Sequence, residues 1–153
     1  MGNDQAARTD MFLGEFRIVV PGLAALFGVQ LSMAFTTAWD DLSMAMRLVN
    51  FASIVATAAA LLVILVPSAY HRLTHGPEVS ADFLRYAQRH VGVGYAFLAL
   101  SLTLSLALQA ARTFGDERAA WAVGGAALMA FLVMWGLLPR ARAARNPAGR
   151  VTP

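Results

Sequence analysis

Four stretches of the chain consist of hydrophobic and small neutral residues and contain no charged side chain. They cover residues 18–39, 48–70, 91–111 and 119–139, and are 22, 23, 21 and 21 residues long. An α-helix rises about 1.5 Å per residue, so about 20 apolar residues cross a hydrocarbon core about 30 Å thick. The pattern therefore predicts four transmembrane helices with few residues outside them.

The predicted fold class is all-α, a bundle of four transmembrane helices. Hydrophobic residues make up 58% of the chain and charged residues 14%, whereas about 25% of a typical soluble domain is charged. The predicted organisation has three parts: a cytoplasmic and interfacial N-terminal segment (1–17), a transmembrane domain (18–139; helices at about 18–39, 46–70, 89–111 and 119–139) and a basic, disordered tail (140–153).

The distribution of basic residues predicts how the chain is oriented. All 12 basic residues are arginines. Nine lie in the N-terminal segment, the loop 71–90 and the tail, and three lie in the other two connections. Cytoplasmic segments carry the excess of arginine, so both termini are expected in the cytoplasm. Exclusive use of arginine, with abundant Ala, Gly and Val, is typical of GC-rich bacterial genomes. We therefore expect a multi-pass protein of the bacterial plasma membrane.

Charge and cysteine content narrow the classes of function. The pI of 10.2 reflects arginines at membrane edges, where topology and anionic lipid headgroups account for them, so we expect a lipid bilayer and no nucleic acid as partner. The chain has no cysteine, and the histidines at 71, 75 and 90 do not have the spacing of a metal site. No carboxylate lies inside an apolar run. We therefore expect no enzyme, no cofactor and no metal.

Uncharged polar residues recur at helical spacing and define one face of the second and third predicted helices. Polar side chains avoid lipid, so this face should point into the bundle or toward another subunit. On the third helix His90, Gly94 and Phe97 continue the same face. The first helix adds Gln30, Ser32, Thr36 and Thr37. The polar face itself comprises Arg47, Asn50, Ser53 and Thr57 on the second helix and Ser101, Ser105, Gln109 and Arg112 on the third.

Two interpretations of this polar face remain open. In one, hydroxyls and amides line a hydrated path with Arg47 and Arg112 at its outer mouth. In the other, the same groups make the interhelical hydrogen bonds and close contacts that hold any membrane bundle together. Four helices of about 21 residues enclose a narrow interior, so a conducting path would need a homo-oligomer whose polar faces meet at a symmetry axis.

Two motifs carry a resemblance to a known family. One is the start of the first helix, EFRIVVPG at 15–22 followed by ALFGVQ at 25–30, and the other is PSAYHR at 67–72. The chain resembles a family of small four-span membrane proteins of unknown function from actinobacteria, some of which carry the label sodium:proton antiporter. If the motifs mark a site, the resemblance places it mostly at the cytoplasmic edge, at Glu15, Arg17, Pro21, Gln30, Tyr70, His71 and Arg72.

The leading hypothesis is a small oligomeric ion channel or transporter. The alternative is a non-conducting accessory, scaffold or lipid-binding protein of the membrane. A sodium/proton antiporter is a further alternative, which the absence of an intramembrane carboxylate disfavours, since buried carboxylates usually carry the coupling ions.

Overall fold

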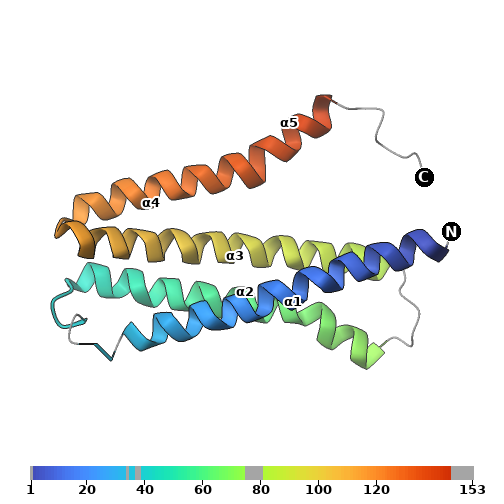
Figure 1. Cartoon of the computed structure of the whole chain (residues 1–153), viewed down its shortest axis with the longest axis horizontal. Coiled ribbons are helices and arrows are strands. Elements are labelled where there is room, and N and C mark those ends of the chain that lie inside the picture. Colours follow the sequence, from blue (N-terminus) through green and yellow to red (C-terminus); the bar gives the residue numbers. More distant parts are fainter. Residues whose placement is uncertain (1, 34, 37–38, 75–80, 146–153) are drawn as a thin grey trace. The chain divides into compact units, whose positions relative to one another are not determined.

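A computed structural model of the chain describes the backbone of residues 2–33, 35–36, 39–74 and 81–145. Side chains are described for residues 17–33, 35–36, 39–67, 69, 83 and 85–141. The predicted all-α fold is confirmed, and the described residues contain no β-strand. The elements are α1 (Gly2–Met33), α2 (Met44–Thr74), α3 (Ala81–Phe114), α4 (Glu117–Phe131), the π-helical segment η2 (Leu132–Leu137) and α5 (Leu138–Arg145) (Figure 1).

Three helical segments are long and apolar enough to cross a membrane. They are Met44–Pro67, Arg85–Phe114 and Glu117–Ala141, of 24, 30 and 25 residues. A shorter apolar helix, Arg17–Met33, corresponds to the first predicted run. These segments expose large aliphatic and aromatic side chains such as Leu62, Leu106, Trp121 and Met129. Outward-facing apolar side chains on helices of this length are typical of helical membrane proteins.

The helices do not coincide with the charge-free runs. The first helix begins at Gly2 and ends at Met33, although the apolar run continues to Trp39. The second and third extend past their runs to Thr74 and Phe114. Backbone hydrogen bonding continues through charged residues outside the apolar layer, so the absence of charge marks the part of a helix suited to lipid rather than its ends. The predicted tail is helical to Arg145, and residues 146–153 lie outside the described part.

Helix ends have identifiable caps. The Ser43 hydroxyl accepts a hydrogen bond from the Met46 amide at 3.3 Å, at the start of α2. Gly115 ends α3 with φ of 64°, a left-handed conformation that favours glycine. Asp116 then caps α4, because its carboxylate accepts from the Arg118 amide at 2.8 Å.

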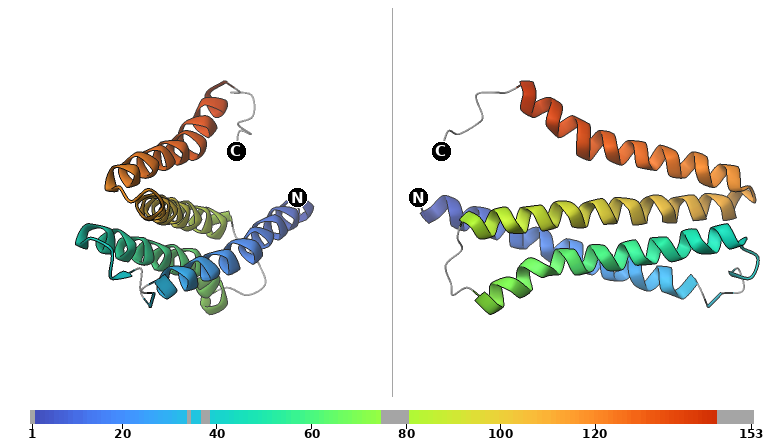
Figure 2. Two further views of the ribbon diagram at one scale, coloured as in Figure 1. Left: turned by 60° about the vertical axis from the view of Figure 1, so that its left-hand side comes forward. Right: turned by 180° about the vertical axis from the view of Figure 1, so that it is seen from behind.

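The contacts between residues divide the chain into two units, 1–101 and 102–153. The first unit contains α1, α2 and most of α3. Its apolar core consists of Leu23, Ala60 and Ile64, packed against side chains that include Phe97. Pro67 is buried within α2, whose ribbon changes direction in its C-terminal part (Figure 2), as proline bends helices.

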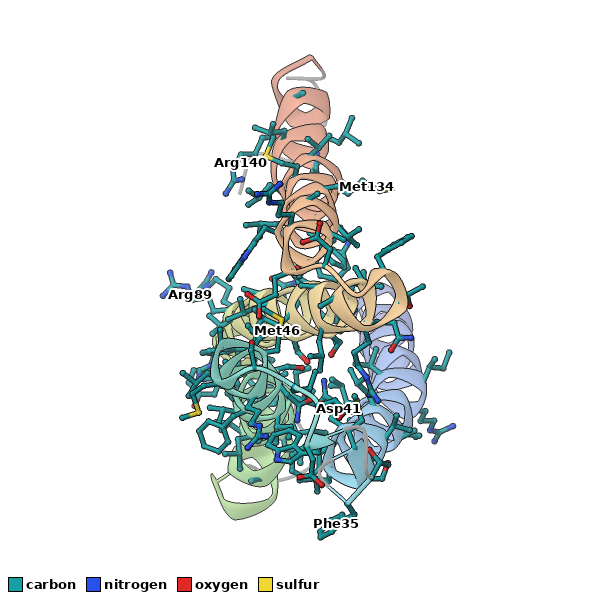
Figure 3. All side chains as sticks on the ribbon, turned by 90° about the vertical axis from the view of Figure 1, so that its left-hand side faces the viewer. Phe35, Asp41, Met46, Arg89, Met134 and Arg140 are labelled. Carbon is teal, nitrogen blue, oxygen red and sulfur yellow. The ribbon has the colours of Figure 1, made fainter. Side chains whose placement is uncertain are left out.

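The second unit contains the end of α3, α4, η2 and α5. Only Ala120 and Gly124 of α4 are buried, and η2 has no buried residue. An added Cβ on Gly124 would lie 3.0 Å from the Cβ of Ala107, so small residues allow α3 and α4 to approach closely here. Along the same helical ribbon Met134 and Arg140 project outward (Figure 3).

Candidate functional site: a buried amide–hydroxyl cluster

Four polar side chains meet inside the first unit, and we call them the amide–hydroxyl cluster: Gln30, Ser53, Thr57 and Ser101. They come from three helices: Gln30 from α1, Ser53 and Thr57 from adjacent turns of one face of α2, and Ser101 from α3. Their exposed fractions are 4%, 1%, 0% and 0%. The cluster is therefore enclosed by the protein, and its groups must find partners among themselves.

The amide of Gln30 is the centre of the cluster. Its Nε2 donates to Ser53 Oγ at 2.7 Å and to Ser101 Oγ at 2.9 Å. Its Oε1 accepts from Thr57 Oγ1 at 2.8 Å. One side chain of α1 thereby bonds to both of the other helices, which fixes the three helices at this level.

The hydroxyls complete a closed ring of hydrogen bonds. The hydroxyls of Thr57 and Ser101 are hydrogen-bonded to each other, and either could donate. Since Thr57 has one hydrogen and gives it to the Gln30 carbonyl, we assign Ser101 as the donor in this pair. The ring then runs from the Gln30 N–H to Ser101, from Ser101 to Thr57, and from Thr57 back to Gln30. Bonds arranged head to tail in this way polarise and strengthen one another.

The backbone supplies further acceptors. Ser53 Oγ donates to the carbonyl oxygen of Ser101 at 3.3 Å. The carbonyl of Ser53 lies 3.1 Å from Thr57 Oγ1 and offers the Thr57 hydrogen a second acceptor. The hydroxyl of Thr57 can thus change partner by a small rotation, without any movement of a helix.

Asn50 lies one turn from Ser53 on α2 but, unlike the cluster residues, is not fully hydrogen-bonded. Its side chain is 2% exposed, and its Nδ2 has no hydrogen-bond partner among the described residues. A buried donor without an acceptor costs about 1–3 kcal/mol. Such a cost is tolerated where a bound ligand or water supplies the missing acceptor.

Buried residues divide α2 into a polar half and an apolar half. The buried polar residues Asn50, Ser53 and Thr57 all lie in the half that follows the 39–43 connection, beside the buried apolar Met46 and Ala56. The buried residues further along, Ala60, Ile64 and Pro67, are all apolar. At about 1.5 Å per residue, Asn50 to Thr57 extends roughly 10 Å along the helix and Ala60 to Ile64 roughly 6 Å. The interior of the first unit therefore changes from hydrogen-bonding to apolar at the level of Thr57.

Arg47 stabilises the connection between α1 and α2. Its Nε donates to the carbonyl of Leu42 and its guanidinium to the carbonyl of Asp40, both at 3.1 Å. The guanidinium also lies 5.8 Å from the ring centroid of Trp39. The positive charge is thus held at the end of the polar half by neutral partners.

The structure brings together only part of the predicted polar face. Asn50, Ser53, Thr57 and Ser101 are buried in the first unit, as described above. Ser105 and Arg112 are half-buried and Gln109 is exposed, all three in the second unit. His90 is half-buried, and its Nδ1 lies 2.9 Å from the carbonyl oxygen of Tyr86 on its own helix, with the two ring centroids 4.1 Å apart.

The residues predicted for the cytoplasmic edge are not brought together by the described side chains. Arg17 and Pro21 are exposed on α1, like Arg89 on α3 (Figure 3). Gln30 belongs to the amide–hydroxyl cluster instead. The remaining members, whose side chains lie outside the described part, are Glu15, Tyr70, His71 and Arg72.

One contact between helices could not be predicted from the spacing of residues. Gln30 and Ser101 are 71 positions apart and hydrogen-bonded, whereas the helical spacing argument relates only residues of one helix. The available signal was that Gln30 is the one long polar side chain inside the first apolar run. Such a side chain needs a partner from a neighbouring helix.

The apolar helices and the enclosed polar cluster together define an all-helical protein with three helices able to span a membrane. The chain belongs to a family of unknown function (DUF6328), whose model matches residues 3–139. No curated protein and no solved structure matches the chain.

Proposed function

We propose that the protein moves small ions across a membrane through the interior of its first unit. The observation that carries this proposal is the buried polar half, in which hydroxyl and amide groups of three helices converge at the level of Thr57. Polar groups of this kind are costly away from water and are kept in membrane proteins where ions or polar solutes are handled. Arg47 would stand where ions enter this half.

The path proposed here lies within one subunit. Ser53, Thr57 and Ser101 are at most 1% exposed, so they would be reached from inside the unit rather than from a symmetry axis. The apolar core of Leu23, Ala60 and Ile64 would close the path beyond Thr57. A hydrophobic constriction of this kind blocks ions until the helices separate. The described conformation would then be a closed one.

The proposal includes cytoplasmic termini and a homo-oligomeric assembly. The arginine distribution supports cytoplasmic termini, which would place the 39–43 connection and the polar half on the outer side of a bacterial plasma membrane. A homo-oligomer is compatible with the exposed apolar surface of α4, where Trp121, Leu128 and Met129 face outward. In this arrangement each subunit would carry its own path.

A second candidate function is favoured by the closed hydrogen-bond ring. Because Gln30, Ser101 and Thr57 satisfy one another, the cluster can serve as a structural tie between three helices without any ion. The protein would then be a non-conducting membrane component, such as an accessory or scaffold protein.

Ion flux in proteoliposomes separates the two candidates. Under the transport proposal, purified protein conducts ions, and Thr57→Val reduces the flux at least about tenfold because the hydroxyl at the closing level is lost. Ser32→Ala serves as the matched control, since Ser32 is exposed and its hydroxyl donates to the Val29 carbonyl of its own helix. Absence of flux for cations and anions at every voltage and pH would reject transport and favour the structural role.

A further inference from the structure

We infer that the polar half of the first unit binds a small monovalent anion of the halide type, with the Asn50 amide as its first donor. This inference rests on the proposed function for its role in transport, and it names the charge of the transported ion. The binding itself can be tested without any flux measurement.

The unpartnered side-chain nitrogen of Asn50 indicates what kind of ligand could bind there. Its Nδ2 is buried and unpartnered among the described residues, and an amide nitrogen carries two hydrogens and no acceptor capacity. The group that completes it must accept hydrogen bonds. A metal cation cannot do so, whereas a halide can accept from several donors at once.

The charges along the three helices also favour a negatively charged ligand. Arg47 precedes Asn50 by one turn, and its contacts with Leu42 and Asp40 are to neutral carbonyl oxygens. The sequence has no Asp or Glu in α2, none in α1 after Glu15 and none in α3 after Asp82. Within these helices an anion in the polar half would meet the positive charge of Arg47 and no carboxylate, which lowers the cost of leaving water. Asp40 and Asp41 of the adjoining 39–43 connection are exposed, so their negative charges are screened by solvent.

The side-chain oxygens of the cluster already accept hydrogen bonds, which further disfavours the binding of a cation. Gln30 Oε1 already accepts from Thr57, and the Ser53 and Ser101 hydroxyl oxygens accept from the Gln30 amide. A cation would compete with these donors for the same oxygens. An anion at Asn50 accepts from a donor outside the ring and leaves the hydrogen bonds of Gln30, Ser101 and Thr57 intact.

The test uses chloride NMR line broadening on the full-length protein in detergent micelles. Wild type should give excess broadening that saturates with chloride and is displaced by bromide but not by gluconate. Asn50→Leu keeps the side-chain volume and removes the unpartnered donor, so the protein should fold, and chloride binding should weaken roughly tenfold or more. Thr103→Val is the matched control: the Thr103 hydroxyl is also buried and unpartnered among the described residues but lies in the second unit, so binding should be unchanged.

The outcomes separate this inference from the proposed function. Saturable binding lost in Asn50→Leu supports the anion site. No saturable binding in wild type, or binding unchanged in Asn50→Leu, overturns it and indicates that a water molecule completes Asn50. Cation flux in proteoliposomes without chloride binding would leave the transport proposal standing and refute the anion. Chloride binding without any flux would do the opposite.

Discussion

Gly94 of α3 faces the side chain of Ile64 on α2 so closely that a larger residue would force the two to shift apart. A Cβ atom added to Gly94 would overlap Cγ1 of Ile64 and lie 2.9 Å from its Cδ1, with the Ala60 carbonyl oxygen at 3.5 Å. Ile64 is 2% exposed and belongs to the apolar core of the first unit. Gly94 thus permits the helix contact that closes the apolar half beneath the amide–hydroxyl cluster.

Gly94→Ala should therefore destabilise the protein. Overpacking costs about 1–3 kcal/mol, and this exceeds the gain of up to about 1 kcal/mol from replacing a helical glycine by alanine. Reversible unfolding in mixed micelles measures the change in free energy. Gly92→Ala is the control, since a Cβ there meets nothing within 4 Å, and it should be neutral or stabilising.

A double mutant tests whether overlap with Ile64 causes the loss of stability in Gly94→Ala. Ile64→Ala removes both atoms that a Cβ on Gly94 would approach, so Gly94→Ala should cost little in that background. Equal costs of Gly94→Ala with and without Ile64 would show that the two side chains are not coupled.

Gln30→Leu should destabilise the first unit by about 2 kcal/mol. The substitution keeps the size of the side chain but removes the bonds to Ser53, Ser101 and Thr57. Single interhelical hydrogen bonds contribute about 0.6 kcal/mol on average and at most about 1.7, and three hydroxyls lose a partner together. The same unfolding assay measures the loss, with Ser32→Ala on the same helix as a variant that should change little. A loss no larger than that of Ser32→Ala would mean that the ring does not hold the helices together.

The sequence predicted the helices more completely than the cluster. Long charge-free runs lead directly to membrane helices because an α-helix satisfies its backbone hydrogen bonds within one segment. Helical spacing also placed Asn50, Ser53 and Thr57 on one face, and all three are buried. Spacing could not relate Gln30 to Ser101, since contacts between helices depend on rotation and depth. The unpartnered state of Asn50 is likewise a property of packing, not of residue order.

Arg47→Lys should loosen the connection between α1 and α2. The guanidinium reaches the Leu42 and Asp40 carbonyls from two nitrogens and lies over Trp39, an arrangement that a single ammonium group cannot reproduce. Amide hydrogen exchange of residues 39–43 should become several-fold faster, while exchange in α4 stays the same. Arg89→Lys, at an exposed position of α3, should leave both rates unchanged. Unchanged exchange at 39–43 in Arg47→Lys would show that these bonds do not order the connection.

The close approach of Gly124 to Ala107 predicts a specific cross-link in the second unit. An added Cβ at Gly124 would lie 3.0 Å from the Ala107 Cβ, near the roughly 3.5–4.5 Å that a disulfide needs, and the slightly short spacing can relax at an otherwise exposed helix. Because the chain has no cysteine, the pair Ala107→Cys with Gly124→Cys should form one internal disulfide under mild oxidation, measured by the loss of thiol labelling. The pair Ala107→Cys with Gly125→Cys is the control, since a Cβ at Gly125 meets nothing within 4 Å. Equal oxidation of both pairs would refute the Gly124–Ala107 contact.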